Sequence, residues 1–113
     1  MANKNYFLNG VAELLILSIL VKNDTYIYGI KKVVAEVSED KLPMSQNTIY
    51  AAAYKLEDEG KITEYSKKVG RKRTRVYYHI EPSGVEYLEK LRKEYGLVTD
   101  SVNKIFNYLE DPE

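Results

Sequence analysis

The sequence predicts a mainly α-helical fold with one β-hairpin, in the layout of a winged helix-turn-helix followed by a long C-terminal helix. Three observations lead to this prediction. Helical apolar spacing recurs through residues 11–59, two β-prone runs with a basic segment between them follow, and a regular apolar repeat occupies the last part of the chain. With 113 residues, of which 44% are hydrophobic, the chain has the size and composition of a single globular domain.

The first two helices are predicted from the spacing of apolar residues. Residues 11–22 carry apolar side chains on more than one stripe, which is typical of a helix buried on several sides. Asn23, Asp24 and Thr25 then provide turn and N-cap chemistry, because short polar side chains bond to nearby backbone amides. A second helix is expected over residues 28–38. Its apolar stripe consists of Ile30, Val33, Val34 and Val37.

A third helix is expected over residues 46–59. Pro43 interrupts the chain before it, Ser45 is a suitable N-cap, and Gly60 is placed to end it. One face of this helix is apolar and is predicted to join the core: Ile49, Ala52, Ala53 and Leu56. The opposite face carries polar, aromatic or small side chains: Gln46, Asn47, Tyr50, Ala51, Tyr54 and Lys55.

The hairpin is predicted from two β-prone runs, residues 62–69 and 75–80, with Gly70 and basic residues between them. The chain has 17 basic and 17 acidic residues, yet residues 61–80 contain seven basic residues and one acidic residue. Most of these basic residues lie close together: Lys67, Lys68, Arg71, Lys72, Arg73 and Arg75. Such a patch can bind a polyanion because salt screens the more distant charges; a merely solvated hairpin tip is the alternative.

A final helix is expected to begin at Pro82 and to extend to about residue 108. Uncharged residues recur along it at alternating spacings of three and four: Leu88, Leu91, Tyr95, Val98, Val102, Ile105 and Leu109. This pattern is typical of a coiled-coil face and predicts a homodimer. Packing on the chain's own first helix is the alternative, and both can hold together. The chain thus divides into a winged helix-turn-helix, residues 1–81, and a dimerisation helix, residues 82–113, within one structural unit.

The composition excludes several classes of function. With no cysteine and a single histidine, His79, the chain lacks the usual ligands of zinc and iron-sulfur sites, and we expect no metal and no cofactor. No Ser-His-acid set and no glycine-rich phosphate loop is present, so an enzyme is the least favoured class. The N-terminus lacks the features of a secretory signal, and the densest apolar run, residues 14–21, is too short to span a bilayer. We expect a soluble, cytoplasmic protein that does not contact a membrane.

The predicted arrangement suits binding to double-stranded DNA. A helix about 10–12 Å across fits a major groove about 12 Å wide, where amides read base edges, while Lys and Arg on a hairpin neutralise phosphates. The predicted DNA-binding residues are Gln46, Asn47, Thr48, Tyr50, Tyr54, Lys55, Lys67, Lys68, Arg71, Lys72, Arg73 and Arg75. For the helix there is an alternative, in which Gln46 and Asn47 merely occupy its start while Tyr50 and Tyr54 pack on the surface.

Several short motifs occur in an order and spacing that resemble the PadR family of transcriptional regulators. These motifs are Tyr28-Gly29-Ile30, Asn47-Thr48-Ile49-Tyr50, residues 55–62, residues 75–80 and Gly84. The resemblance covers residues 14–109, and the single helix after the hairpin is similar to the compact PadR subfamily. The sequence departs from the family pattern at Ala52 and Ala53, at Lys55, where Arg is common, and at Glu81-Pro82, where a Thr cap is usual. The first two of these departures leave the operator sequence open.

The resemblance implies a DNA-binding regulator, expected to be a repressor, which is released by a small aromatic or cationic effector. A homodimer joined through the last helix has twofold symmetry and would therefore require a palindromic operator. In similar compact regulators an aromatic residue after the hairpin takes part in drug binding, which the resemblance carries to Tyr95, with Gly96 leaving a gap beside it. A core tyrosine next to a tolerated glycine is the alternative. Two other functions are open: a protein-interaction module whose basic hairpin binds an acidic protein, and a ligand scavenger without operator recognition.

Overall fold

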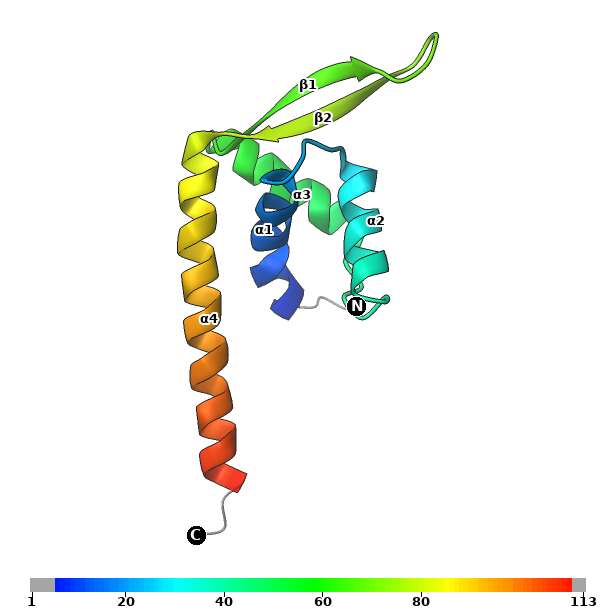
Figure 1. Ribbon diagram of the computed structural model, residues 1–113. Coiled ribbons are helices and arrows are strands. Elements are labelled where there is room, and N and C mark those ends of the chain that lie inside the picture. The colour runs from blue at the N-terminus through cyan, green and yellow to red at the C-terminus, as the bar shows by residue number, and fades with distance from the viewer. Residues whose placement is uncertain (1–5, 111–113) are drawn as a thin grey trace.

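The computed structural model describes residues 6–110, and it contains the six elements that the sequence predicts, in the predicted order (Figure 1). They are α1 (Tyr6–Leu20), α2 (Ile27–Val37), α3 (Gln46–Asp58), β1 (Ile62–Lys68), β2 (Thr74–Ile80) and α4 (Pro82–Glu110). The mainly α-helical fold with an antiparallel hairpin is therefore confirmed. Residues 1–5 and 111–113, the outer ends of the two predicted segments, lie outside the described residues.

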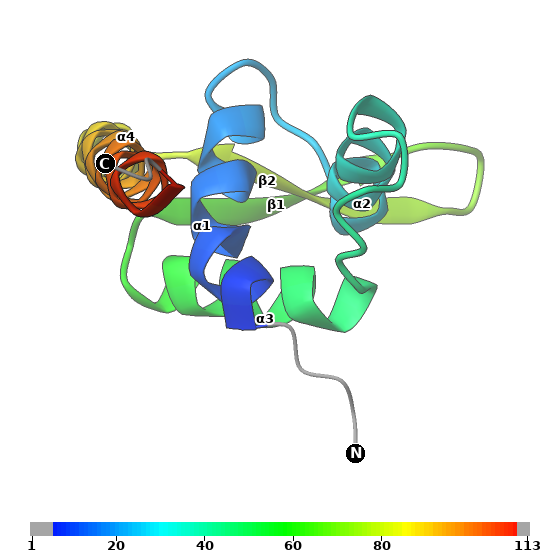
Figure 2. The same ribbon diagram turned by 90° about the horizontal axis from the view of Figure 1, so that it is seen from below.

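α1 is the central helix of the fold. Figure 2 shows it between α2 and α4, with α3 crossing below them, and Ile16, Leu17 and Leu20 are fully buried. Burial on several sides is what its apolar side chains predict, because a helix with a single apolar stripe leaves its other faces in water. The helix begins at Tyr6 and ends at Leu20, so its start is more than one turn before the predicted residue 11 and its end is two residues before the predicted residue 22.

The start of α2 differs from the prediction. The N-cap is Tyr26, whose backbone is extended and whose side chain makes no capping hydrogen bond, so N-capping by the residues before it was wrong. Thr25 forms a β-bridge with Tyr78 instead, and the Tyr78 amide donates to the Thr25 carbonyl oxygen at 2.7 Å. The Asp24 side chain contacts the hairpin rather than the helix, whereas the Thr25 side chain lies beside Gly29 of α2. Of the predicted apolar stripe, Ile30 and Val34 are buried whereas Val33 and Val37 are exposed.

α3 begins and ends as its capping residues predict. The Ser45 Oγ accepts a hydrogen bond from the Thr48 amide at 3.1 Å, and Gly60 adopts a positive φ of 76° just beyond the helix. Positive φ suits glycine because it has no Cβ. The inner face of the helix is formed by Ile49, Ala53 and Leu56, which are buried, and Ala52, which is half-buried.

The hairpin projects away from the helices (Figure 1). Its strands are paired from Ile62↔Ile80 at the base to Lys68↔Thr74 near the tip, and the Val69 amide donates to the Arg73 carbonyl at 3.1 Å across the turn. Ile62 and Ile80 are buried, as is Tyr78, so only the base of the hairpin joins the core. We call residues 62–80 the wing.

α4 packs on α1 with its first half and extends past the rest of the molecule with its second (Figure 1). At Gly84 the helix lies so close to the Lys61 backbone carbonyl that a Cβ would collide with it. Leu88 is buried and Leu91 packs against the core, whereas every residue from 100 to 110 is exposed. Across residues 6–110 no helix combines the length and the apolar character that crossing a membrane requires.

Candidate nucleic-acid interface

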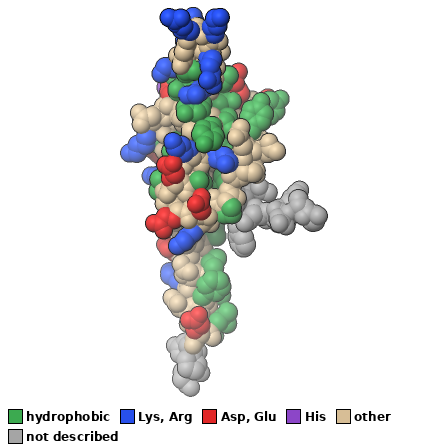
Figure 3. All heavy atoms as spheres, turned by 90° about the vertical axis from the view of Figure 1, so that its right-hand side faces the viewer, with side chains coloured by type: hydrophobic (Ala, Val, Ile, Leu, Met, Phe, Trp, Pro, Cys, Tyr) green, Lys and Arg blue, Asp and Glu red, His purple; other side chains and the backbone are tan. Residues whose placement is uncertain are grey.

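The six predicted basic residues gather at the outer part of the wing. Figure 3 shows Lys and Arg side chains at its tip, beyond the helical body. Five of the six are exposed, and Arg75 is half-buried. Within residues 6–110 none of the six forms a salt bridge. Because no carboxylate of the described residues forms an ion pair with them, they are available to a polyanion.

Two carboxyl groups lie close together near the base of the wing. Glu57 at the end of α3 lies beside Glu64 of β1, and burial together with the nearby Glu64 carboxyl raises the pKa of Glu57 above its usual value. Burial also raises the pKa of Tyr78 to about 12, so its hydroxyl stays protonated. The six predicted basic residues all lie farther out on the wing than Glu64.

The outer face of α3 presents hydrogen-bonding and aromatic groups to solvent. Gln46 and Asn47 are exposed in its first turn, and Tyr50 and Tyr54 follow with exposed fractions of 57% and 66%. Thr48 differs from them: it is half-buried, and its Oγ1 accepts a hydrogen bond from Ser45 at 3.0 Å. Its main role within the chain is thus to complete the N-cap. Four of the six predicted side chains of α3 form one exposed polar and aromatic surface.

Lys55 is held by other helices of the same chain. Its Nζ lies 2.9 Å from Oε2 of Glu13 in α1, and the Tyr87 hydroxyl in α4 donates to the other oxygen of Glu13 at 2.9 Å. The hydrogen bond to Glu13 raises the pKa of Lys55. The Glu13 carboxylate thus joins α1, α3 and α4. Sequence reasoning missed this contact because Glu13 is an isolated acidic residue in an otherwise apolar helix.

A second contact missed from the sequence joins the wing to the segment between α1 and α2. Asp24 accepts a hydrogen bond from the Tyr65 hydroxyl at 2.7 Å, and its other oxygen lies 2.9 Å from Nδ1 of His79. The bond from Tyr65 lowers the pKa of Asp24, and the pairing with Asp24 raises the pKa of His79. One signal in the sequence could have indicated part of this contact. The alternation of the two strands, with Tyr65 paired to Tyr77, places Tyr65 and His79 on the same face of the hairpin.

The second half of α4 has an exposed apolar face. The exposed fractions of Val98, Val102, Ile105 and Leu109 lie between 39% and 70%. Phe106, 56% exposed and four residues after Val102, extends this face and was missed from the heptad spacing. Leu88 and Leu91, which the same spacing includes, pack within the chain. The predicted coiled-coil face is thus buried within the chain in the first half of α4 and exposed in the second half.

A cavity of about 300 Å³ lies where α1 meets the middle of α4. It is lined by Val11, Leu14, Leu15, Ser18, Leu42, Arg92 and Tyr95. Its walls are mostly apolar, and Arg92 is the one charged residue among those that line it. At Gly96 an added Cβ would meet no heavy atom within 4 Å, so contacts within residues 6–110 do not account for this glycine.

Three helices followed by a hairpin with an unneutralised basic tip, with an exposed polar face on the third helix, define a winged helix-turn-helix DNA-binding protein. Residues 16–90 match the model of the transcriptional regulator PadR-like family, and the chain belongs to this family. It is therefore a DNA-binding regulator of transcription and not an enzyme.

Solved structures of similar proteins agree with this assignment. A transcriptional regulator from Clostridium thermocellum is 29% identical with a TM-score of 0.80, over 91% of this chain and 97% of that one. A PadR family transcription regulator from Clostridium difficile is 28% identical with a TM-score of 0.73, over 85% and 98%. A PadR-like transcriptional regulator from Bacillus cereus is 27% identical with a TM-score of 0.76, over 90% and 97%. The match covers both the wing and α4.

Proposed function

We propose that the chain is a homodimeric repressor of transcription, acting in the cytoplasm, that binds a palindromic operator and is released by a small planar effector. One observation carries the proposal: the chain exposes two unlike surfaces, a cationic wing beside a polar α3 face, and an apolar face on α4. The first suits duplex DNA and the second suits another copy of the chain. Residues 1–81 read the DNA and residues 82–113 join the subunits.

In this proposal, α3 selects the sequence and the wing provides affinity. Asn47 and Gln46 contact base edges in the major groove, because amides match donor and acceptor pairs there, and Tyr50 and Tyr54 contact the groove walls. The wing cations contact phosphates, which carry no sequence information. Lys55, held by Glu13 at 2.9 Å, supports the position of α3, and Thr48 supports its N-cap.

The proposed dimer forms through the second half of α4. This helix has 29 residues and is about 43 Å long at 1.5 Å per residue, while the molecule extends 68 Å along its longest axis. The helical body covers only its first half, so an apolar face about three turns long remains in water. Contiguous exposed apolar surface of this kind is typical of an interface. Tyr95 lies where the buried part of the predicted coiled-coil face meets its exposed part.

The proposed effector site includes Tyr95 and Gly96. The cavity beside Tyr95 supports it, because apolar walls and one aromatic ring suit a planar ligand that stacks. The Arg92 guanidinium on the same wall repels a cation, so of the two effector classes an aromatic compound without positive charge fits this cavity better. A ligand bound there releases DNA only if it binds more tightly to an arrangement of the two winged helix-turn-helix units that does not fit the operator.

Fluorescence anisotropy with the duplex upstream of the chain's own gene tests the proposal. We expect tight binding that weakens steeply between two salt concentrations and exceeds binding to a random duplex, with release by planar aromatic compounds. Equal affinity for both duplexes would contradict operator recognition. Undiminished binding with every aromatic compound tested, in a protein that recognises its operator, would contradict the effector and leave the rest of the proposal standing.

A further inference from the structure

An aromatic row crosses the wing and the segment before α2. The alternation of the strands places Tyr65 and Tyr77 on the face opposite the buried Tyr78, and their ring centroids lie 5.8 Å apart with an interplanar angle of 27°. Tyr26, the N-cap of α2, continues the row, with its centroid 5.4 Å from that of Tyr77. Three rings from three separate segments therefore form one packed surface.

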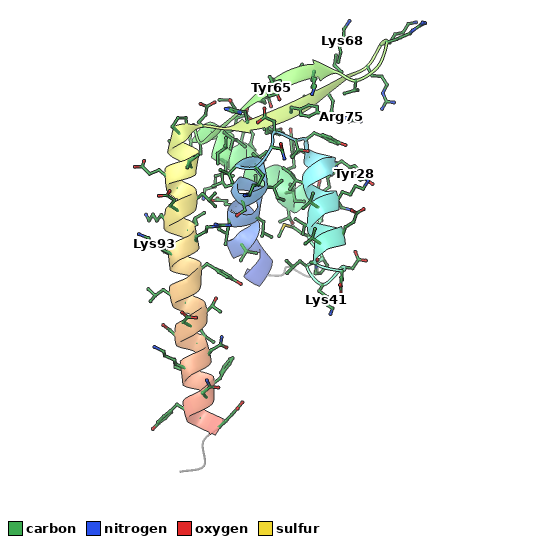
Figure 4. The ribbon with its side chains drawn as sticks, in the orientation of Figure 1. Tyr28, Lys41, Tyr65, Lys68, Arg75 and Lys93 are labelled. Atoms are coloured by element: carbon green, nitrogen blue, oxygen red, sulfur yellow. The ribbon has the colours of Figure 1, made fainter. Side chains whose placement is uncertain are left out.

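Two wing cations lie over rings of this row. The Arg75 guanidinium carbon is 4.1 Å from the centroid of Tyr26, and the Lys67 Nζ is 4.8 Å from the centroid of Tyr77. Both distances are within the range of a cation-π interaction. A ring face holds a cation without neutralising it, whereas a carboxylate would cancel its charge. Arg75 extends from β2 of the wing (Figure 4) and is half-buried, and its guanidinium over Tyr26 is thus held in place with its charge intact.

The row is fixed to the helical body by residues 24 and 25. Asp24 accepts from the Tyr65 hydroxyl and pairs with His79, and the Thr25 carbonyl accepts from the backbone of β2. These bonds attach both strands of the wing to the segment that leads into α2. The rings beneath the cations are therefore in a defined position relative to the helices.

We propose that Tyr26 and Tyr77 are positioning residues for DNA binding, which hold Arg75 and Lys67 in the orientation in which they meet phosphates. This inference rests on the proposed function, in which the wing contacts the DNA backbone. Long basic side chains lose rotamer freedom when they bind, and a side chain already ordered by a ring loses less. The gain is largest for Arg75, because the planar guanidinium stacks on an aromatic face.

A double-mutant cycle on the full chain tests the proposal. Affinity for a short duplex of random sequence is measured for wild type, Tyr26→Leu, Arg75→Gln and the double variant. We expect Tyr26→Leu alone to weaken binding about two- to fivefold and to have no further effect once Arg75 is replaced. Tyr26→Leu should keep the salt dependence of wild type, whereas Arg75→Gln should reduce its slope by about one phosphate contact.

Two further variants separate positioning from folding. Tyr26→Phe keeps the ring and should bind like wild type. Tyr28→Leu removes an exposed ring of the same helix over which no cation lies among residues 6–110, and it should also bind like wild type. If Tyr26→Leu does not fold, the same cycle is run with Tyr77→Leu and Lys67→Gln, with the same non-additive result expected.

The outcomes distinguish this inference from the proposed function. An Arg75→Gln variant that binds DNA as wild type does would remove Arg75 from the interface and with it the basis of the inference. Loss of affinity with Arg75→Gln but none with Tyr26→Leu would overturn the positioning role alone. Fully additive losses in the double variant would also overturn it, because Tyr26 would then act independently of Arg75.

Discussion

The wing and the second half of α4 both project from the helical body, but the hydration of their exposed side chains differs. The wing exposes ammonium and guanidinium groups, which water solvates well, so an isolated chain carries them without penalty. The second half of α4 exposes Val98, Val102, Ile105 and Phe106, whose transfer out of water is favourable. In the proposed function, the wing therefore binds its partner in a salt-dependent way, whereas the α4 face stays covered by a second copy of the chain.

The largest effect is expected from a charge placed on the apolar face of α4. Val102→Asp would put a carboxylate among apolar side chains of two subunits, where no partner compensates its lost hydration. We expect the dimer dissociation constant, measured by sedimentation, to rise on the order of 100-fold or more. Asn107→Asp is the matched control, because residue 107 is exposed and lies roughly 140° around the helix from residue 102, away from the apolar face. If both variants stay equally dimeric, this face is not the interface.

The junction between the wing and α4 should be the next most sensitive position. A methyl group at residue 84 would collide with the Lys61 carbonyl and lie 2.8 Å from Cγ1 of Ile80. Gly84→Ala should therefore lower the free energy of unfolding by about 1–3 kcal/mol in a thermal or urea melt. Gly96→Ala adds the same methyl group where the chain leaves room, and should raise the free energy of unfolding by up to about 1 kcal/mol. Equal effects would refute the close packing.

Substitutions in the wing and in α3 should change DNA affinity in different ways. Arg73→Ala removes a charge from the tip and should weaken binding to specific and random duplexes alike, with a salt slope smaller by about one contact. Asn47→Ala removes an exposed amide and should cost about 1–3 kcal/mol on the preferred site and less on random DNA. Anisotropy on both duplexes measures each effect. Equal losses on the two duplexes from both substitutions would contradict the division of roles.

The smallest effect is expected at the exposed pair that attaches the wing to the body. Asp24 raises the pKa of His79 above its usual 6.5, so the pairing stabilises the fold fully below pH 6.5 and is lost as the pH rises through the folded pKa. Asp24→Asn should lower the pKa of His79. This pKa is measured from the chemical shift of the His79 ring protons in an NMR titration. An unchanged pKa in the variant would show that the pair does not form in solution.

Local patterns in the sequence were sufficient to predict the six elements. Apolar spacing identifies α1 and α3, Ser45 and Gly60 mark the ends of α3, and Pro82 starts α4. Each of these signals acts within a few residues, which is why it can be read from one sequence. The exposed basic tip of the wing follows in the same way from its composition.

Contacts between distant segments were not predictable in this way. Asp24 was assigned to a helix cap because its neighbours are turn-forming residues, yet its partners are Tyr65 and His79, 41 and 55 residues away. The pairing of Lys55 with Glu13 likewise depends on how α3 crosses α1. The spacing of Leu88 is the same as that of Val102, and only the position of α1 makes one internal and the other exposed.

A chemical footprint on the DNA upstream of the chain's own gene shows whether the protein binds a symmetric operator as a dimer. A dimer joined through α4 presents two copies of α3 and two wings related by twofold symmetry. We expect two protected half-sites in inverted orientation, about one helical turn or a multiple of it apart, with wing contacts on the outer backbone that disappear first as salt increases. A single asymmetric protected segment, or protection that does not depend on sequence, would contradict it.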